Sequence, residues 1–221
     1  EKVAPYDNIR VVAAKTQYPE GAEKMLIKKV MGRQVPSGKL PADVGCVVSN
    51  TSTAKAISDA IQKGMPLVER AVSVTGDFIR NPGNYMVKLG TNVQELIDHC
   101  GGITGDDVVL KMGGPMMGAP LKDTNVPIIK GSNGVIAIAA DHTEEKECIK
   151  CGRCVDVCPM ELQPLEIYKY GQLGDAEKLL TLNVMDCFSC KCCEYICSSK
   201  IPLVSKINAA KGLVMPLLKK K

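Results

Sequence analysis

The sequence predicts an α+β protein built from three segments, and three observations support this fold class. Strand-like and helix-like patterns alternate over residues 1–66. Residues 67–141 contain several short strand-like runs around one helical stretch. Residues 142–221 show helical spacing between two dense cysteine runs. The chain has 221 residues, of which 45% are apolar, so it is long enough for two or three small domains with real cores.

The first segment, residues 1–66, is expected to form the edge of an α/β layer. Residues 8–14 and 44–48 are short apolar runs that predict buried strands. Residues 19–31 carry apolar side chains at helical spacing, and residues 54–62 form a second helical stretch. Asn50 and the hydroxyl residues after it can cap this second helix. The order strand, helix, strand, helix is typical of an α/β layer.

The second segment, residues 67–141, predicts a small α+β module. Strands are expected at residues 67–75, 85–89, 108–112 and 134–139. A short helix is expected at residues 93–100, because Asn92 can cap its start and two glycines follow its end. Four strands with one helix resemble a β-grasp.

The third segment, residues 142–221, is expected to be helical between its cysteine runs. Residues 162–169 and 175–182 have apolar side chains at helical spacing. A last helix is expected over residues 206–218, broken near Pro216 because proline lacks a backbone N–H.

Composition argues against several kinds of protein. The net charge of +4 is mild, and no clustered basic face suggests a nucleic-acid partner. No apolar run reaches the ~20 residues that cross a bilayer, so no transmembrane segment is predicted. The first residues lack the apolar stretch of a signal peptide, which favours the reducing cytoplasm. Clustered cysteines in that compartment indicate metal or redox chemistry.

Nine of the eleven cysteines lie in two short runs with the same internal spacing. Both runs have the pattern C-x2-C-x2-C-x3-C, which is the spacing of bacterial two-cluster ferredoxins. Three thiolates on such a tight loop can surround one [4Fe-4S] cluster, while the fourth cysteine of each run binds the other cluster. The predicted ligand sets are Cys148, Cys151, Cys154 and Cys197 for one cluster, and Cys187, Cys190, Cys193 and Cys158 for the other.

Structural zinc is the alternative, since C-x2-C pairs also build zinc ribbons. Zinc needs four ligands, usually from two separated pairs, and two complete four-cysteine runs fit that pattern poorly. Cys192 lies between two predicted ligands, but only Cys193 completes the spacing on both sides, so Cys192 is predicted to be a bystander.

The remaining cysteines and the histidines predict no further site. Cys46 and Cys100 are expected to be small core residues. His99 and His142 are isolated in the sequence, and each is expected to be hydrogen-bonded or solvated. Residues 112–118 are rich in glycine and methionine and predict a close-packed turn.

Together these residues resemble the C subunit of Rnf electron-transport complexes, and the likeness covers nearly the whole chain. The stretches that carry the resemblance are residues 18–26, 32–38, 72–76, 81–83, 112–118, 126–127 and 130–131, both cysteine runs, and residues 199–203.

The resemblance implies three domains. Residues 1–66 are expected to be the C-terminal part of a flavin domain like that of complex I, in effect a partial α/β remnant. Residues 67–141 are expected to be a soluble-ligand-binding β-grasp, and residues 142–221 a helical dicluster ferredoxin domain. Family members exchange electrons with NAD(H) through bound FMN. They dock peripherally on the cytoplasmic face of a bacterial membrane complex that couples ferredoxin:NAD+ electron transfer to ion pumping, so the other subunits, and ferredoxin indirectly, are expected partners.

The chain departs from the family in one respect. The glycine-rich loop that holds flavin and nucleotide phosphates is absent from this sequence. The resemblance therefore implies an N-terminally truncated member, with FMN and NAD(H) bound only by the full-length protein. Asn50 matches the family position that approaches the flavin, although the residues themselves favour a helix N-cap.

Two other functions remain open from the sequence. The related cobalamin-reducing flavoprotein of bacterial microcompartments shares this layout. A stand-alone ferredoxin-like carrier or docking module would use residues 1–141 only to bind partners. No general acid–base pair or activated nucleophile is recognisable in the chain. As a subunit of an NAD-linked oxidoreductase complex, it is therefore expected to carry its chemistry in the clusters, and the chain alone is expected to lack the flavin/NADH active site.

Overall fold

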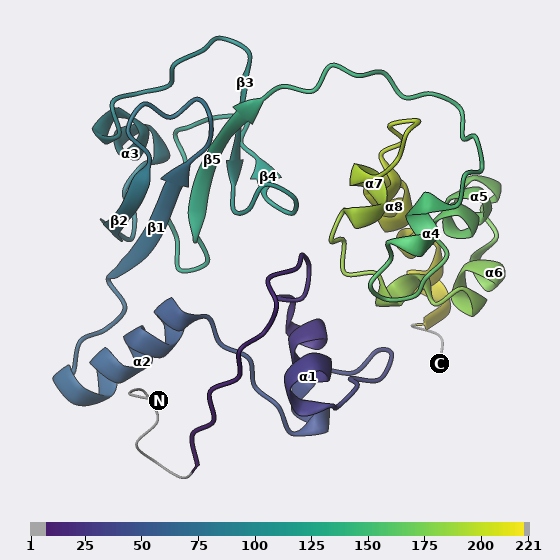
Figure 1. Ribbon diagram of the computed structural model, residues 1–221, viewed down its shortest axis with the longest axis horizontal. Helices are drawn as coiled ribbons and strands as arrows, with labels where there is room; N and C mark the ends of the chain where they lie inside the picture. Colours follow the sequence, from purple (N-terminus) through teal and green to yellow (C-terminus); the bar gives the residue numbers. More distant parts are fainter. Residues whose placement is uncertain (1–7, 219–221) are drawn as a thin grey trace. The chain divides into compact units, whose positions relative to one another are not determined.

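The computed structural model describes residues 8–218, which fall into two compact units (Figure 1). A helical unit contains residues 8–48, 148–198 and 202–218, and a sheet unit contains residues 49–147 and 199–201. The boundaries predicted at residues 66 and 141 stay predictions. The first residues, considered above for a signal peptide, lie at positions 1–7, outside the described residues.

The sheet unit is organised around a mixed five-stranded sheet. Its strands are β1 (Glu69–Thr75), β2 (Gly83–Lys88), β3 (Val108–Met112), β4 (Ala119–Pro120) and β5 (Gly134–Ala139). The strand order is β2-β1-β5-β3-β4, in which β1 and β5 are parallel and the other neighbours are antiparallel. The four predicted strands are confirmed, and β3 and β5 have the predicted bounds.

Side chains of β1, β5 and helix α3 (Val93–His99) form the core of this unit. Alternate residues of β1 are buried, and Val72 and Val74 are completely enclosed, as expected for a strand with one covered face. Asn92 caps α3 by accepting a hydrogen bond from the Gln94 N–H, as the sequence predicts. Gly76 has a φ of 112°, and a Cβ there would lie 2.0 Å from the Ala137 carbonyl oxygen, so only glycine fits.

Helix α2 (Thr51–Lys63) precedes the sheet and confirms the predicted second helix of the chain. The turn at residues 112–118 is close-packed as predicted, because a Cβ on Gly118 would lie 2.4 Å from the Gly114 carbonyl oxygen. Strand β4 was not predicted, since its two residues are exposed and include a proline.

The helical unit consists of short helices. They are α1 (Glu23–Met31), the 3-10 helix η1 (Pro41–Val44), α4 (Arg153–Asp156), α5 (Pro164–Leu173), α6 (Ala176–Thr181), the 3-10 helix η2 (Val184–Asp186), α7 (Cys192–Tyr195) and α8 (Leu203–Leu218). Helix α8 packs against α5 and α6, and its Ile207 and Val214 are almost completely buried. Ile167 of α5 and Leu179 of α6 are fully buried as well. These apolar contacts form the core of the unit.

Two predicted strands are wrong. Residues 8–14 and 44–48 form no strand, and helices are the only regular structure that the described residues 8–66 contain. Every residue from 8 to 14 is exposed, and Val47 is 88% exposed. A strand is stable only when it pairs with neighbours and covers an apolar face. The partial α/β layer therefore does not form among these residues, whereas the coarser α+β class holds.

The predicted break near Pro216 is also wrong, because α8 continues through it to Leu218. Pro216 lies in the last described turn, where its missing N–H removes only one helical hydrogen bond. Helix α8 also begins earlier than predicted, at Leu203. Glu194 explains this start, since its carboxylate accepts a hydrogen bond of 3.0 Å from the Val204 N–H. Between residues 8 and 218, no helix has both the length and the apolar character that crossing a membrane requires.

Candidate metal centres

The two cysteine runs have the same backbone conformation, position by position. A four-residue helix follows the second cysteine of each run, α4 in the first and α7 in the second. Residues with left-handed backbone occur at three equivalent pairs of positions: Lys150 and Ser189, Gly152 and Lys191, and Glu161 and Lys200. Non-glycine residues rarely adopt this conformation, because it costs about 1–2 kcal/mol per residue. Its repetition shows that both runs form the same specialised loop.

This loop turns backbone N–H groups toward cysteine sulfur atoms. The N–H of Lys150 lies 3.4 Å from Sγ of Cys148. The N–H of Arg153 donates to Cys151, and at the equivalent position the N–H of Cys192 donates to Cys190. Hydrogen bonds to sulfur stabilise negative charge, which is what thiolates bound to an iron–sulfur cluster carry.

The first predicted ligand set comes together around Cys154. Burial is the main cause that raises the pKa of the Cys154 thiol. Negative charge on Cys148, Cys151 or Cys197 raises it further, so all three thiols lie close to Cys154. Cys197 comes from the second run, so this set includes the predicted crossed ligand.

The second predicted set comes together in the same way. Burial raises the pKa of Cys193 to about 12, and the nearby thiols of Cys187, Cys190 and Cys158 add to the shift. The pKa of Cys158 is also raised, first by burial and then by Cys190 and Cys187. Cys158 thus lies beside cysteines of the other run. The structure brings together the members of each predicted set, and their binding of iron stays a prediction.

The two sets differ in their surroundings, and we name them accordingly. The buried site consists of Cys158, Cys187, Cys190 and Cys193. Its four thiols line one apolar pocket together with side chains that include Leu162, Ile167, Phe188, Val204 and Ile207. Cys190 and Cys193 are only 8% and 7% exposed.

The exposed site consists of Cys148, Cys151, Cys154 and Cys197. Cys151 is exposed, and the hydrogen bond from the Arg153 N–H lowers the pKa of its thiol. At Cys190 the equivalent hydrogen bond is outweighed by burial, and the pKa rises to about 11. One loop geometry therefore holds thiols in two electrostatic environments.

The chemistry of both sites fits iron–sulfur clusters. A [4Fe-4S] cluster takes four cysteine thiolates. Each thiolate binds a different iron atom, so the ligands surround a volume and need not converge on one point. Among residues 8–218, no three His, Cys, Asp or Glu side chains converge closely enough to hold a single metal ion. Because burial favours protonated thiols, the buried site must lose protons when it binds metal.

Cys192 lies beside the buried site, directly before the predicted ligand Cys193. It is the first residue of α7 and corresponds to Arg153, the first residue of α4. The thiols that raise the pKa values of Cys193 and Cys158 belong to the same set as these two residues. The Cys192 thiol instead raises the pKa values of Cys190 and Tyr18. Its predicted exclusion from the ligands is consistent with this position and stays a prediction.

Sequence reasoning missed two polar residues beside the buried site. Glu194 follows Cys193 directly and caps α8. Tyr18 donates a hydrogen bond of 2.7 Å from its hydroxyl to the carbonyl oxygen of Cys190. Burial raises the pKa of Tyr18, and the thiols of Cys190 and Cys192 raise it further. The only sequence signal for Tyr18 is its place in the stretch 18–26 that resembles the Rnf family.

Asn50 acts as the N-cap that its residue type predicts. Its side-chain oxygen accepts a hydrogen bond of 2.9 Å from the Ser52 N–H at the start of α2. A contact between Asn50 and flavin stays a prediction.

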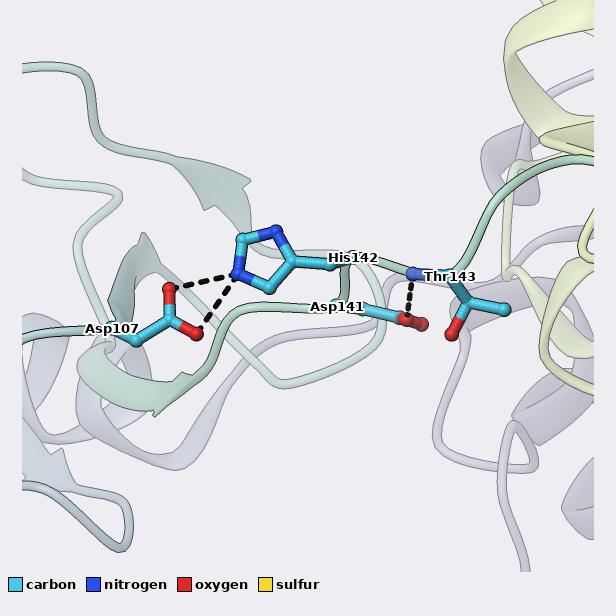
Figure 2. A network of polar contacts seen from close by, with 4 residues as sticks. All are labelled: Asp107, Asp141, His142 and Thr143. Carbon is cyan, nitrogen blue, oxygen red and sulfur yellow. Dashed lines mark hydrogen bonds and ion pairs between the residues drawn. The ribbon is translucent and has the colours of Figure 1, made fainter.

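The remaining candidates are placed mostly as predicted. Cys100 is fully buried, but Cys46 is only half-buried, because residues 44–48 form no strand. His99 packs edge-on against Tyr85. Nε2 of His142 lies 2.9 Å from both carboxylate oxygens of Asp107, and Figure 2 marks these two contacts with dashed lines. Both side chains are exposed, so this pair is a surface contact.

Beside it, the Thr143 N–H donates a 3.0 Å hydrogen bond to Asp141, as Figure 2 also shows. Hydrogen bonds from Thr143 are the main cause that lowers the pKa of the Asp141 carboxyl, and Lys200 lowers it further.

Three family models match successive parts of the chain. Residues 1–59 match the Nuo51 FMN-binding domain, residues 71–120 match the SLBB domain, and residues 147–201 match a 4Fe-4S dicluster domain. The last match includes all eight predicted ligands.

Curated relatives are similar to most of the chain. The chain is 46% identical over 167 residues to the C subunit of the proton-translocating ferredoxin:NAD(+) oxidoreductase complex of Clostridium ljungdahlii, which covers 74% of this chain and 36% of the relative. It is 44% identical over 200 residues to the C subunit of the ion-translocating oxidoreductase complex of Rhodobacter capsulatus, covering 89% of this chain and 38% of the relative. It is 41% identical over 206 residues to the C subunit of the Na(+)-translocating ferredoxin:NAD(+) oxidoreductase complex of Acetobacterium woodii. This match covers 92% of this chain and 46% of the relative. The chain thus spans less than half the length of these relatives.

Proposed function

This chain belongs to the family of C subunits of ion-translocating oxidoreductase complexes, and from that premise we propose that its two cysteine sites relay electrons within such a complex. The observation that carries the proposal is that two four-cysteine sets each lie together on loops of equivalent conformation. The match of the same residues to a 4Fe-4S dicluster domain supports it.

The residues of each site have distinct tasks in this proposal. Cys148, Cys151, Cys154 and Cys197 hold one [4Fe-4S] cluster, and Cys158, Cys187, Cys190 and Cys193 hold the other. Each cluster, when bound, would store and release one electron at a time. The thiolates of Cys148, Cys151 and Cys190 are stabilised by hydrogen bonds from backbone N–H groups. The donors are Lys150, Arg153 and Cys192, respectively. Apolar side chains line the buried site.

The remaining functions belong to the whole protein and its complex. Residues 1–66 are proposed to be part of a flavin domain, residues 67–141 a β-grasp that binds a soluble ligand, and residues 142–221 the dicluster ferredoxin domain. In the full-length protein, FMN would exchange electrons with NAD(H). The protein would sit peripherally on the cytoplasmic face of the membrane, bound to other subunits and linked indirectly to ferredoxin.

Two alternatives are less well supported. The relatives are named as subunits of ion-translocating complexes, which does not favour the cobalamin-reducing flavoprotein of microcompartments. A stand-alone carrier is disfavoured because the matches to the FMN-binding and SLBB domains accompany the dicluster domain in one chain.

Anaerobic purification followed by iron and sulfide quantitation tests the cluster proposal. Two cubanes predict about eight irons and eight sulfides per chain, with two reducible EPR signals. Bound zinc without iron would contradict it. Membership of a membrane complex is tested separately with the full-length protein in its host. Retention in the membrane fraction after gentle lysis is expected, and its complete release would contradict the assignment to a membrane complex.

A further inference from the structure

Residues of the N-terminal segment 8–48 contact the buried site within the helical unit. The Tyr18 hydroxyl donates its 2.7 Å hydrogen bond to the carbonyl of Cys190, a ligand of that site. The Ser37 hydroxyl lies 2.7 Å from a carboxylate oxygen of Asp186, the residue directly before Cys187. Both contacts end on or beside a ligand of the buried site.

The polar contacts to the exposed site come from residues within or next to the two cysteine runs. Sγ of Cys148 and Cys151 accept from the N–H groups of Lys150 and Arg153. A side-chain hydrogen bond from Ser198, next to Cys197, also reaches Cys151. The two sites thus differ in which part of the chain contacts them.

A contact of this kind affects the reduction potential of a bound cluster. Potentials depend on hydrogen bonds, burial and local charge. The Tyr18 hydroxyl directs its positive hydrogen toward the Cys190 carbonyl, which stabilises negative charge at that site. Ser37 likewise offsets part of the negative charge of Asp186. Loss of either contact makes reduction of a cluster at the buried site less favourable.

We propose that Tyr18 and Ser37 are positioning residues for the buried site, and that this site is the member of the pair on the side of the flavin domain. Both residues lie within residues 1–59, which match the Nuo51 FMN-binding domain. In this proposal the buried site is therefore the end of the electron relay that lies next to the flavin domain. The inference rests on the proposed function, since it requires both sites to hold clusters.

The test is an EPR-monitored redox titration of the anaerobically reconstituted chain. Cys193→Ala and Cys151→Ala first assign one EPR signal to the buried site and one to the exposed site. Tyr18→Phe is then expected to lower the midpoint potential of the buried-site signal and to leave the exposed-site signal unchanged. Tyr195→Phe is the matched control: Tyr195 lies inside the second run but is 75% exposed, so neither potential should move.

Ser37→Ala provides an independent second variant, expected to lower the potential of the same signal. A shift in the exposed-site signal, equal shifts in both signals, or no shift with either variant would overturn the inference. These outcomes differ from a failure of the proposed function, in which the unsubstituted chain would assemble no pair of cubanes. Iron quantitation on every variant separates the two cases.

Discussion

The exposed and buried cysteine sites have the same loop conformation and different environments. Equivalent residues are left-handed in both, and equivalent N–H groups donate to Cys151 and Cys190. Yet the pKa of Cys151 is lowered, whereas that of Cys190 rises to about 11 because Cys190 is buried. The spacing of the run determines the loop, and the helices packed around it determine its electrostatics.

This difference predicts that water and small molecules have easier access to the exposed site than to the buried site. Cys190 and Cys193 lie in an apolar pocket that includes Ile207 of α8. Cys151 is exposed, and its neighbour Ile149 is 68% exposed. The two sites each have four cysteine ligands, yet they should respond differently to small molecules and to substitutions.

The largest effect is expected when a ligand is replaced by glycine and a small thiol is added. Cys151→Gly and Cys193→Gly should each lose one [4Fe-4S] cluster, leaving about four irons per chain. 2-Mercaptoethanol can reach the gap at the exposed position and supply a thiolate, so iron should return to about eight for Cys151→Gly alone. Iron quantitation and EPR measure this result. Equal rescue of both variants would show that the two sites do not differ in access.

A smaller effect, on stability, is expected when apolar side chains beside the two sites are shortened to alanine. Ile207 is 1% exposed, so Ile207→Ala should cost about 2–5 kcal/mol of stability through lost packing and a cavity. Ile149→Ala, beside the exposed site, should change stability by no more than about 0.5 kcal/mol. Thermal unfolding of both variants under anaerobic conditions measures the difference. Similar melting temperatures for the two variants would contradict the contrast in burial.

The smallest effect concerns the equivalent left-handed positions Gly152 and Lys191, with φ of 78° and 67°. Gly152→Ala should cost about 1 kcal/mol, because a side chain disfavours this conformation. Lys191→Gly should stabilise the second loop by up to about 1 kcal/mol. The melting temperatures should therefore move in opposite directions. A stabilising Gly152→Ala would mean that the first loop does not hold the left-handed conformation.

Much of the fold follows from local sequence patterns. Runs such as residues 108–112, which begin with two valines, predict strands at their observed bounds, because β-branched residues suit a half-covered sheet. The failures depend on distant partners. Residues 8–14 have a strand-like composition but no neighbouring strand, and the start of α8 is set by Glu194, ten residues away along the chain.

The same distinction applies to the metal sites. Cysteine spacing predicts both ligand sets, including the exchange of Cys158 and Cys197 between them. It cannot predict that one set is buried, since that results from α5 and α8 packing around it. Nor can it predict the contact of Tyr18 with Cys190, which joins residues far apart in the sequence.

The exchange of the fourth cysteine is the central claim, and Cys158→Ala tests it most directly. Cys158 belongs to the same run as Cys151 but lies beside Cys187 and Cys190. In anaerobic EPR, Cys158→Ala should therefore abolish the same cluster signal as Cys193→Ala and preserve the signal that depends on Cys151. Loss of the Cys151-dependent signal instead would show that each run holds its own cluster, and would contradict the exchange.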